Sequence, residues 1–310
     1  MNTTLKNAVE AADKKAQYDE CAKHLLGQKI ILAHILVRTV EEFYGMNPEE
    51  VVSYIEGEPY ISQVPIESGM TNTWNVEQQI VGMNSENKEI NEGTIRFDII
   101  FYVRNKEQLS QIIINVEAQK DEPDKYDILN RAVFYVCRMI SSQKERDFTG
   151  TNYNDIKQVY SIWICMNMKD NVMNHISLRD RKILGNYTWK GNLNLINIVM
   201  IGLSNTISER RKSYELHRLL GTLLSDSLPV TKKLEIMEHE YKIKTAKNVE
   251  EEMETMCNLG QGIEDRGIEK GEKRLCQLIE KLIELNCQND IQNVISDENF
   301  RKKLYKKYNI

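Results

Sequence analysis

The sequence predicts an α/β protein in which a mixed β-sheet is flanked by helices and followed by a helical C-terminal appendage. Two stretches, Thr94 to Arg104 and Gln111 to Gln119, are rich in Ile, Val, Phe and Tyr and are separated by a short polar segment, as in a hairpin. A third stretch, Val159 to Met166, is almost entirely apolar, which is typical of a strand covered on both faces. Helical spacing of apolar residues precedes and follows these strands.

Length, composition and charge limit the functions that we expect. The 310 residues suffice for one domain, 1–255, and a glycine-spaced charged helical tail, 256–310. The net charge of -5 means that nucleic acid could bind only through local basic patches. The 6 cysteines and 5 histidines show no spacing typical of disulfide, redox or zinc sites. No segment suits membrane crossing or export, so we expect a cytoplasmic protein without a membrane partner.

The N-terminal part predicts two helices and one strand. Apolar residues from Tyr18 to Tyr44 recur at helical spacing and predict a long helix with a broad buried face. Asn47 followed by Pro48 is an N-cap signal, so we expect a short helix from Pro48 to Glu56. Gln79 to Glu86 alternates apolar and polar residues and predicts the first strand, with Glu86 just before a turn built on Asn87 and Asn91.

The predicted hairpin places two acids opposite each other. If the polar residues between its strands form the turn, Arg104 faces Gln111, and counting outward along both strands places Asp98 opposite Glu117. Directly opposed residues lie about 5 Å apart at Cβ. Two such carboxylates among apolar residues need a proton or a cation, and a divalent metal is the usual answer. A register slip, or an edge strand protected by inward charges, is the structural alternative.

At these residues the chain resembles a known nuclease superfamily. An Asp on one strand and Glu-x-Gln on the next, followed by a helix, resembles the PD-(D/E)XK nucleases. The segments EGTIRFDIIFYV, IIINVEAQKD, RAVFYVCRMIS and KQVYSIWICMN together resemble the transposases of that nuclease family, which are related to the recombination-promoting nucleases. The resemblance spans residues 18 to 205 and implies a restriction-endonuclease-like core.

The resemblance implies a metal-dependent DNA endonuclease that hydrolyses phosphodiester bonds in recombination or transposition. Asp98, Glu117 and the backbone carbonyl of Ala118 would hold Mg²⁺ or Mn²⁺, with Glu86 as a candidate additional acid. Gln119, which shares a face with Glu117, would orient the attacking water. Because Gln119 replaces the usual lysine, we expect slow catalysis, and a lysine placed there should retain or raise activity.

Three alternatives to a DNA endonuclease stay open at this point. The same fold could bind nucleic acid with little or no cleavage, because Gln119 is neutral where the superfamily usually has a lysine. It could act on RNA or on single strands, since the same metal chemistry permits either. It could also be a purely structural α/β protein whose charged pair only closes a hairpin.

Candidate nucleic-acid contacts lie in two later segments. The helix predicted from Asp124 to Lys144 places Arg131 and Tyr135 on one face, where the resemblance implies that they contact a phosphate or brace the site. A surface Arg and a half-buried core Tyr would explain the same spacing. Strands are predicted from Asn174 to Leu184 and from Leu193 to Ile201, around a turn at Gly191. A basic–aromatic cluster in this region could follow a nucleic-acid backbone or be an ordinary solvated hairpin. This cluster comprises Arg179, Arg181, Lys182, Tyr187, Trp189 and Lys190.

The C-terminal part predicts helices from Lys212 to Ser225 and from Pro229 to Lys244, and then the tail. In the tail, Ile268, Leu275 and Leu282 lie seven residues apart, a short heptad seam that could dock on its own domain or form a homodimer. The glycine-spaced run before it lacks the ending of a phosphate-binding loop, so we expect no nucleotide site.

Overall fold

The computed structural model describes residues 16–61, 86–89, 93–96, 98–104, 111–120, 123, 125–245, 247–285, 287 and 289–308. The chain divides into two compact units, one of which is Ala16–Cys257 and the other of which contains Asn258–Ile310. This division falls two residues beyond the boundary that the sequence places at 255. Within the described ranges, every helix is too short or too polar to cross a bilayer.

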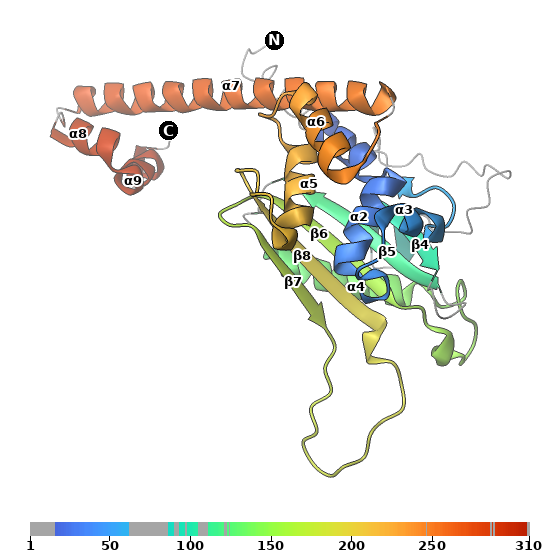
Figure 1. The fold of residues 1–310 in the computed structure, drawn as a ribbon. Helices are drawn as coiled ribbons and strands as arrows, with labels where there is room; N and C mark the ends of the chain where they lie inside the picture. Colours follow the sequence, from blue (N-terminus) through green and yellow to red (C-terminus); the bar gives the residue numbers. More distant parts are fainter. Residues whose placement is uncertain are drawn as a thin grey trace. The chain divides into compact units, whose positions relative to one another are not determined.

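A six-stranded mixed sheet forms the centre of the first unit, with the strand order β1-β4-β5-β6-β8-β7 (Figure 1). β5, β6 and β8 run parallel, whereas β1, β4 and β7 each run antiparallel to the neighbours with which they pair. This is the mixed α/β architecture that the sequence predicts. The strands are β1 (Tyr60–Ile61), β4 (Ile99–Arg104), β5 (Gln111–Gln119), β6 (Val159–Met168), β7 (Val172–Ser177) and β8 (Ile196–Ser204).

The predicted strand from Thr94 to Arg104 is wrong as a single element. Its first part is β3 (Gly93–Arg96), which pairs with β2 (Glu86–Glu89) in a separate two-stranded sheet. β4 begins only at Ile99, because the backbone bends at Asp98 and changes partner there. Of the turn expected at Asn87 and Asn91, the part at Asn87 is wrong, since Asn87 lies inside β2, and Asn91 lies outside the described residues. The rest of the strand predicted from residue 79 lies outside the described residues.

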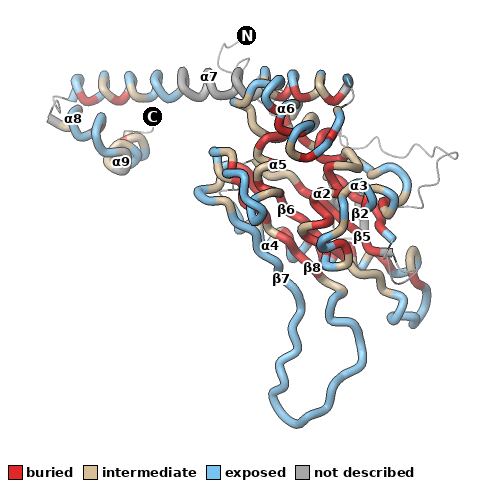
Figure 2. Tube along the Cα trace, in the orientation of Figure 1, coloured by how far each residue is buried: buried red, intermediate tan, exposed pale blue. Residues whose placement is uncertain are grey.

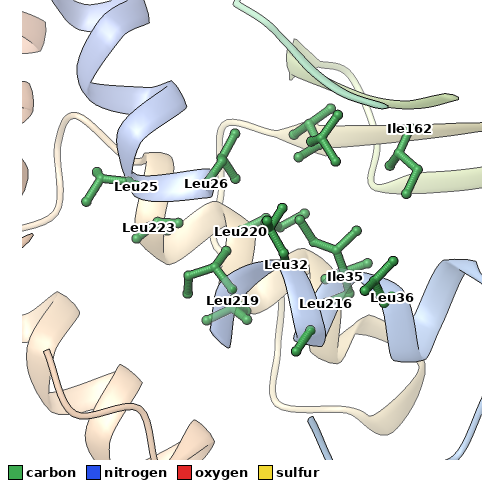
Figure 3. Close-up of a cluster of buried hydrophobic side chains, with 14 of the residues drawn as sticks. Leu25, Leu26, Leu32, Ile35, Leu36, Ile162, Leu216, Leu219, Leu220 and Leu223 are labelled. Carbon is green, nitrogen blue, oxygen red and sulfur yellow. The ribbon is translucent and has the colours of Figure 1, made fainter. Parts of the chain in front are cut away.

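Helices cover both faces of the sheet, and alternating strand residues point to each face. Ile113, Trp163 and Ile198 pack against α4 (Ile128–Ser141), the helix that links β5 to β6. On the opposite face, Ile162 of β6 lies among leucines from residues 16–26, α2 (Lys29–Thr39) and α5 (Glu215–Leu224), as the close-up in Figure 3 shows. The buried red core in Figure 2 is therefore two apolar layers with the sheet between them.

The long helix predicted from Tyr18 to Tyr44 is interrupted. Residues 16–26 are helical, the chain turns at Gly27, and α2 begins at Lys29 after the extended Gln28. A Cβ added at Gly27 would lie 2.5 Å from Cδ1 of Ile61, so β1 approaches the backbone closely at this turn. Glycine also disfavours a helix interior, which explains why apolar spacing alone predicts one helix where there are two.

The helix predicted from Pro48 to Glu56 is shorter than expected. The N-cap is confirmed, because Oδ1 of Asn47 accepts a hydrogen bond of 3.2 Å from the Glu49 amide. The helix then tightens after four residues into a 3₁₀ turn. The short elements of the first unit are η1 (Glu41–Phe43), α3 (Pro48–Val51), η2 (Val52–Tyr54), η3 (Tyr153–Asp155), η4 (Leu193–Leu195) and η5 (Lys212–Tyr214).

α5 is followed by α6 (Val230–Tyr241), the long α7 (Lys247–Glu284), α8 (Asn289–Ser296) and α9 (Glu298–Tyr308), with which the described chain ends. The second unit has its own small core of Leu278, Leu282, Val294 and Leu304. Leu282 belongs to the predicted heptad seam and is fully buried against residues of α8 and α9. This part of the seam therefore packs within its own unit.

Candidate functional site

The two predicted acids lie side by side at the carboxyl end of β5. The register pairs Arg104 with Gln111 and Ile99 with Val116, which confirms the predicted alignment and brings Asp98 opposite Glu117. The Asp98 amide donates a hydrogen bond of 3.0 Å to Oε1 of Glu117, and the Ala118 amide donates one of 3.1 Å to Oδ2 of Asp98. Each carboxylate is thus held by the other strand's backbone.

Two cations from different helices lie beside these acids. Nζ of Lys23, in the helix of residues 16–26, is 2.7 Å from Oδ1 of Asp98. Nη2 of Arg131, on α4, is 3.9 Å from Oε2 of Glu117. The acid side chains are only 16% and 3% exposed, so both charges act through a poorly solvated medium. The protein itself supplies positive charge to the pair, and the proximity of the acids does not by itself require a metal.

Glu117 is the most strongly perturbed acid of this site. Burial and the neighbouring Asp98 carboxylate raise the pKa of Glu117 well above its usual value. The hydrogen bond from the Asp98 amide and the guanidinium of Arg131 lower the pKa in part. Any cation that Glu117 binds must therefore compete with a proton, and metal affinity should increase with pH.

Arg131 joins Gln119 to α4. Its Nη1 donates to Oε1 of Gln119 at 3.4 Å and to the Tyr126 hydroxyl at 3.3 Å, and its Nη2 donates to the Tyr135 hydroxyl at 2.8 Å. The guanidinium also lies over the rings of Tyr135 and Trp163, at 4.9 and 5.3 Å from their centroids. Arg131 and Tyr135 thus form one connected group with the predicted catalytic strand, and Arg131 is not a solvated surface residue.

Sequence reasoning missed Lys23 and the role of Lys120. Nζ of Lys120 lies 3.7 Å from the centroid of the Tyr18 ring and 3.5 Å from Oδ2 of Asp226. The Tyr18 hydroxyl donates to the carbonyl of Leu224 at 2.8 Å. Lys120 therefore ties the end of β5 to residues 16–26 and to the end of α5. The neutral Gln119 is the signal that could have directed a search for a lysine from another element.

The basic candidates between β7 and β8 do not join this group, and the side chain of Glu86 lies outside what the structure describes. Only the backbone of Glu86 is described, in β2 opposite Arg96. Arg179, Arg181 and Lys182 lie between β7 and β8, in a segment that re-enters the sheet at Ile196. Ile196 aligns with Val159 of β6 and thus with Ile113, at the amino end of β5, whereas the acids lie at its carboxyl end. The strand predicted from Asn174 to Leu184 is confirmed as far as Ser177, where β7 ends, and its part over residues 178–184 is wrong.

A polar hollow lies at the same end of the sheet as the acids. Its cavity volume is about 390 Å³, and it is formed where β6 and β8 end. Asn167, near the end of β6, donates through Nδ2 to the Lys120 carbonyl at 3.1 Å, which links this edge to β5. The charged and hydroxyl side chains around the hollow are those of Lys169, Asp170, Ser204, Thr206, Ser208, Glu209, Arg211 and Tyr214.

The donor set at the acid pair suits a hard divalent cation. Two carboxylates and the Ala118 carbonyl are oxygen ligands of the kind that Mg²⁺ takes, with waters completing its shell. In the part of the chain that is described, no three His, Cys, Asp or Glu side chains gather closely enough to hold a metal. The site therefore fits Mg²⁺ or Mn²⁺ as a two-carboxylate site, in which Lys23 must give up its contact with Asp98.

Comparison with known proteins places the chain in no family, since no family model, curated protein or solved structure matches it. The fold and the site define a mixed α/β protein with a largely buried acid pair flanked by lysine and arginine.

Proposed function

We propose that this protein is a metal-dependent phosphodiesterase that cleaves DNA at the site formed by Asp98 and Glu117. The observation that carries the proposal is the pair of acids, each held by the other strand's backbone, with Lys23 and Arg131 on either side. Metal-dependent phosphodiester hydrolysis uses carboxylates to hold a divalent cation and positive groups to receive the negative phosphate. Both kinds of group converge here.

Each side chain of the site would have a separate role in the reaction. Asp98, Glu117 and the Ala118 carbonyl would hold Mg²⁺ or Mn²⁺, which when bound polarises the phosphate and lowers the pKa of a water. Gln119 would orient the attacking water through its amide. Arg131, anchored by Tyr135, would donate to a phosphate oxygen, as guanidinium groups do well.

Lys23 offers the positive charge that position 119 lacks. Its ammonium already lies beside Asp98, so once a metal takes that carboxylate the lysine is free to face the phosphate. Its own helix brings it there, which makes a lysine on β5 unnecessary. In this proposal Lys23 compensates for the missing positive charge at position 119, and catalysis is retained.

A second candidate function is a nucleic-acid-binding module without cleavage. The contact of 2.7 Å between Lys23 and Asp98 favours it, because a metal must displace this ammonium. The raised pKa of Glu117 adds a proton as a second competitor. This candidate predicts DNA binding that is indifferent to Mg²⁺ and to both acids.

A cytoplasmic location and a role in recombination or transposition complete the proposal. The cysteines Cys21, Cys137, Cys165, Cys257, Cys276 and Cys287 are all free thiols, which supports a reducing compartment. The role in recombination rests on the family resemblance of the sequence.

The test is cleavage and metal binding by the purified chain. Supercoiled plasmid, duplex, single-stranded DNA and RNA are incubated with Mg²⁺, Mn²⁺, Ca²⁺ or EDTA, while calorimetry measures metal binding. Asp98→Asn and Glu117→Gln should lose both properties. Asp155→Asn and Glu254→Gln, at exposed acids, are the matched controls and should keep both. Parent protein that neither binds metal nor cleaves any substrate would refute the nuclease, and DNA binding without cleavage would favour the second candidate.

A further inference from the structure

Between β7 and β8 the chain leaves the sheet and returns as a long excursion, residues 178–195, which we call the arm. Figure 1 shows the arm extending beyond the strands, and in Figure 2 it is pale blue along its length. Every residue from 178 to 194 is exposed. Gly185 and Gly191 have φ angles of +72° and +149°, which side chains rarely adopt, so the path of the arm depends on these two glycines.

The arm carries large apolar side chains that its own fold leaves uncovered. Ile183 and Leu184 are 93% and 97% exposed, and Tyr187 and Trp189 are 69% and 83% exposed. Covering one such side chain fully is worth about 1.5–3 kcal/mol. The rings of Tyr187 and Trp189 meet edge to face with centroids 5.1 Å apart, so broad ring surfaces stay open. The arm thus presents a contact surface that the rest of the unit does not use.

The arm is also strongly basic in an acidic protein. The arm has four cations and one acid, Asp180, so its net charge is +3, while the whole chain carries -5. The four cations are Arg179, Arg181, Lys182 and Lys190. Across the described ranges none of these four cations makes a salt bridge. Their charges are therefore available to an anionic partner.

We propose that the arm binds a nucleic-acid strand, with backbone phosphates on its cations and bases stacked on Trp189 and Tyr187. Cations with aromatic rings between them are the chemistry of single-strand binding, where each stacked base contributes about 1–3 kcal/mol. A second copy of the arm would be repelled by equal charge. An anionic membrane is disfavoured, because Asn186 and Thr188 interrupt the apolar residues and leave no continuous apolar face.

The arm would hold a part of the strand away from the acid pair. It joins the sheet at the level of Ile113, six residues before Gln119 on β5, or roughly 20 Å at the rise of a strand. In a strand with the stacked spacing of duplex DNA, that distance spans about six nucleotides at 3.4 Å each. Binding at the arm does not require cleavage. Only the idea that the arm positions a strand for cleavage at the acid pair rests on the proposed function.

The test is binding in EDTA, where no metal-dependent step occurs. Fluorescence anisotropy is measured with a labelled 20-nucleotide single strand, its duplex, and vesicles of neutral or anionic phospholipid, over a range of salt. Replacing Arg179, Arg181 and Lys182 with Ala should reduce the slope of log affinity against log salt by about two to three. The control replaces the exposed Lys144, Lys212 and Lys244 and should leave most of the slope.

A second readout uses the arm's own tryptophan. The experiment uses a parent in which Trp74 is replaced by Phe, so that Trp163 and Trp189 are the remaining tryptophans. Adding the single strand should quench Trp189 emission, and Trp189→Phe should abolish that signal because Trp163 is fully buried. Trp189→Ala with Tyr187→Ala should weaken single-strand affinity at least tenfold. The arm lies outside both apolar cores, so circular dichroism should be unchanged.

Three results would overturn the inference: tighter binding to anionic vesicles than to nucleic acid, equal losses in the arm and control triples, or an unaltered Trp189 signal. These results differ from a failure of the proposed nuclease. A protein that binds through the arm but never cleaves refutes only the nuclease, and arm variants with unchanged binding and cleavage refute only the arm.

Discussion

The ammonium of Lys23 lies 2.7 Å from Oδ1 of Asp98, so a helix near the start of the described chain supplies positive charge to the acid that precedes β4. Lys23 and Asp98 lie far apart in the sequence, and both side chains are largely shielded from water. The contact has two consequences. It stabilises the acid pair while no metal is bound, and it puts a lysine where a phosphate could reach it.

Lys23→Met should separate these two consequences. Without the ammonium, Asp98 is free for a metal, so the Mg²⁺ dissociation constant should fall several-fold. Cleavage at saturating Mg²⁺ should fall by about a hundredfold, the scale of losing one positioned electrostatic group. Calorimetry and plasmid cleavage measure the two effects. Lys29→Met, which removes a pair with the exposed Glu58, is the control. If Lys23→Met cleaves at the full rate, Lys23 only balances the charge of Asp98 and has no role toward the phosphate.

Position 119 should respond differently from what the sequence suggests. Oε1 of Gln119 accepts from Arg131, so a lysine at this position would lose that bond and face a guanidinium at close range. Gln119→Lys should therefore lower cleavage, and Gln119→Ala should lower it by about ten- to a hundredfold, as is typical when a group that orients the site is lost. Single-turnover assays across Mg²⁺ concentrations provide the measurement. A Gln119→Lys enzyme faster than the parent would contradict this reading of Arg131.

The register of the acid pair was predictable because it is local. Alternation and the closing residues Arg104 and Gln111 suffice to place Asp98 opposite Glu117. The same pattern could not reveal that the strand changes sheets, since β3 and β4 are equally β-prone and only the bend at Asp98 separates them. Tertiary partners, not propensity, decide where such a strand ends.

Lys23 was not predictable because nothing in its own helix marks it. Its partner acid lies on a distant strand, and the contact exists only because the helix of residues 16–26 packs against the sheet. The break at Gly27, which sequence spacing misses, ends this helix and starts α2 at Lys29. Apolar periodicity records which faces are buried, and it carries no information about which charged residue meets which acid.

A chain that ends at Cys257 should keep the function of the first unit. Val249, Met253 and Met256 of α7 pack in the core of that unit and are retained. Metal binding and cleavage of a short duplex should be unchanged. DNA affinity should weaken and depend less on salt, because the basic residues of α9 are removed. The matched control replaces Lys303, Lys306 and Lys307 with Ala in the full chain. Failure of the shortened chain to fold would show that the units are not independent.

His34 should make the first unit sensitive to acid. The pKa of His34 is lowered to about 4, chiefly by burial, which the Glu215 carboxylate opposes and the Arg38 guanidinium reinforces. Because the unfolded chain takes up this proton near 6.5, stability is complete above that pH and is lost as pH falls toward 4. The loss from this residue between pH 7.5 and 5 should be about 2 kcal/mol. Urea unfolding of the parent and of His34→Gln measures it. An equal loss in both would exclude His34 as the cause.

Glu117→Gln should stabilise the metal-free protein even as it abolishes cleavage. Burial and the Asp98 carboxylate raise the pKa of Glu117, so the folded protein favours the protonated form of this side chain. The stability that this form contributes is present at low pH and is lost as pH rises through the raised pKa. Glutamine cannot ionise, and its oxygen can still accept from the Asp98 amide. The unfolding midpoint of the variant in EDTA should therefore exceed that of the parent, by an amount that grows between pH 5 and 8.5.

Glu117→Ala, which removes the acceptor as well, should be less stable than Glu117→Gln at every pH. A constant difference between Glu117→Gln and the parent across this range would mean that Arg131 and Lys23 keep Glu117 ionised throughout, and that no proton competes with the metal.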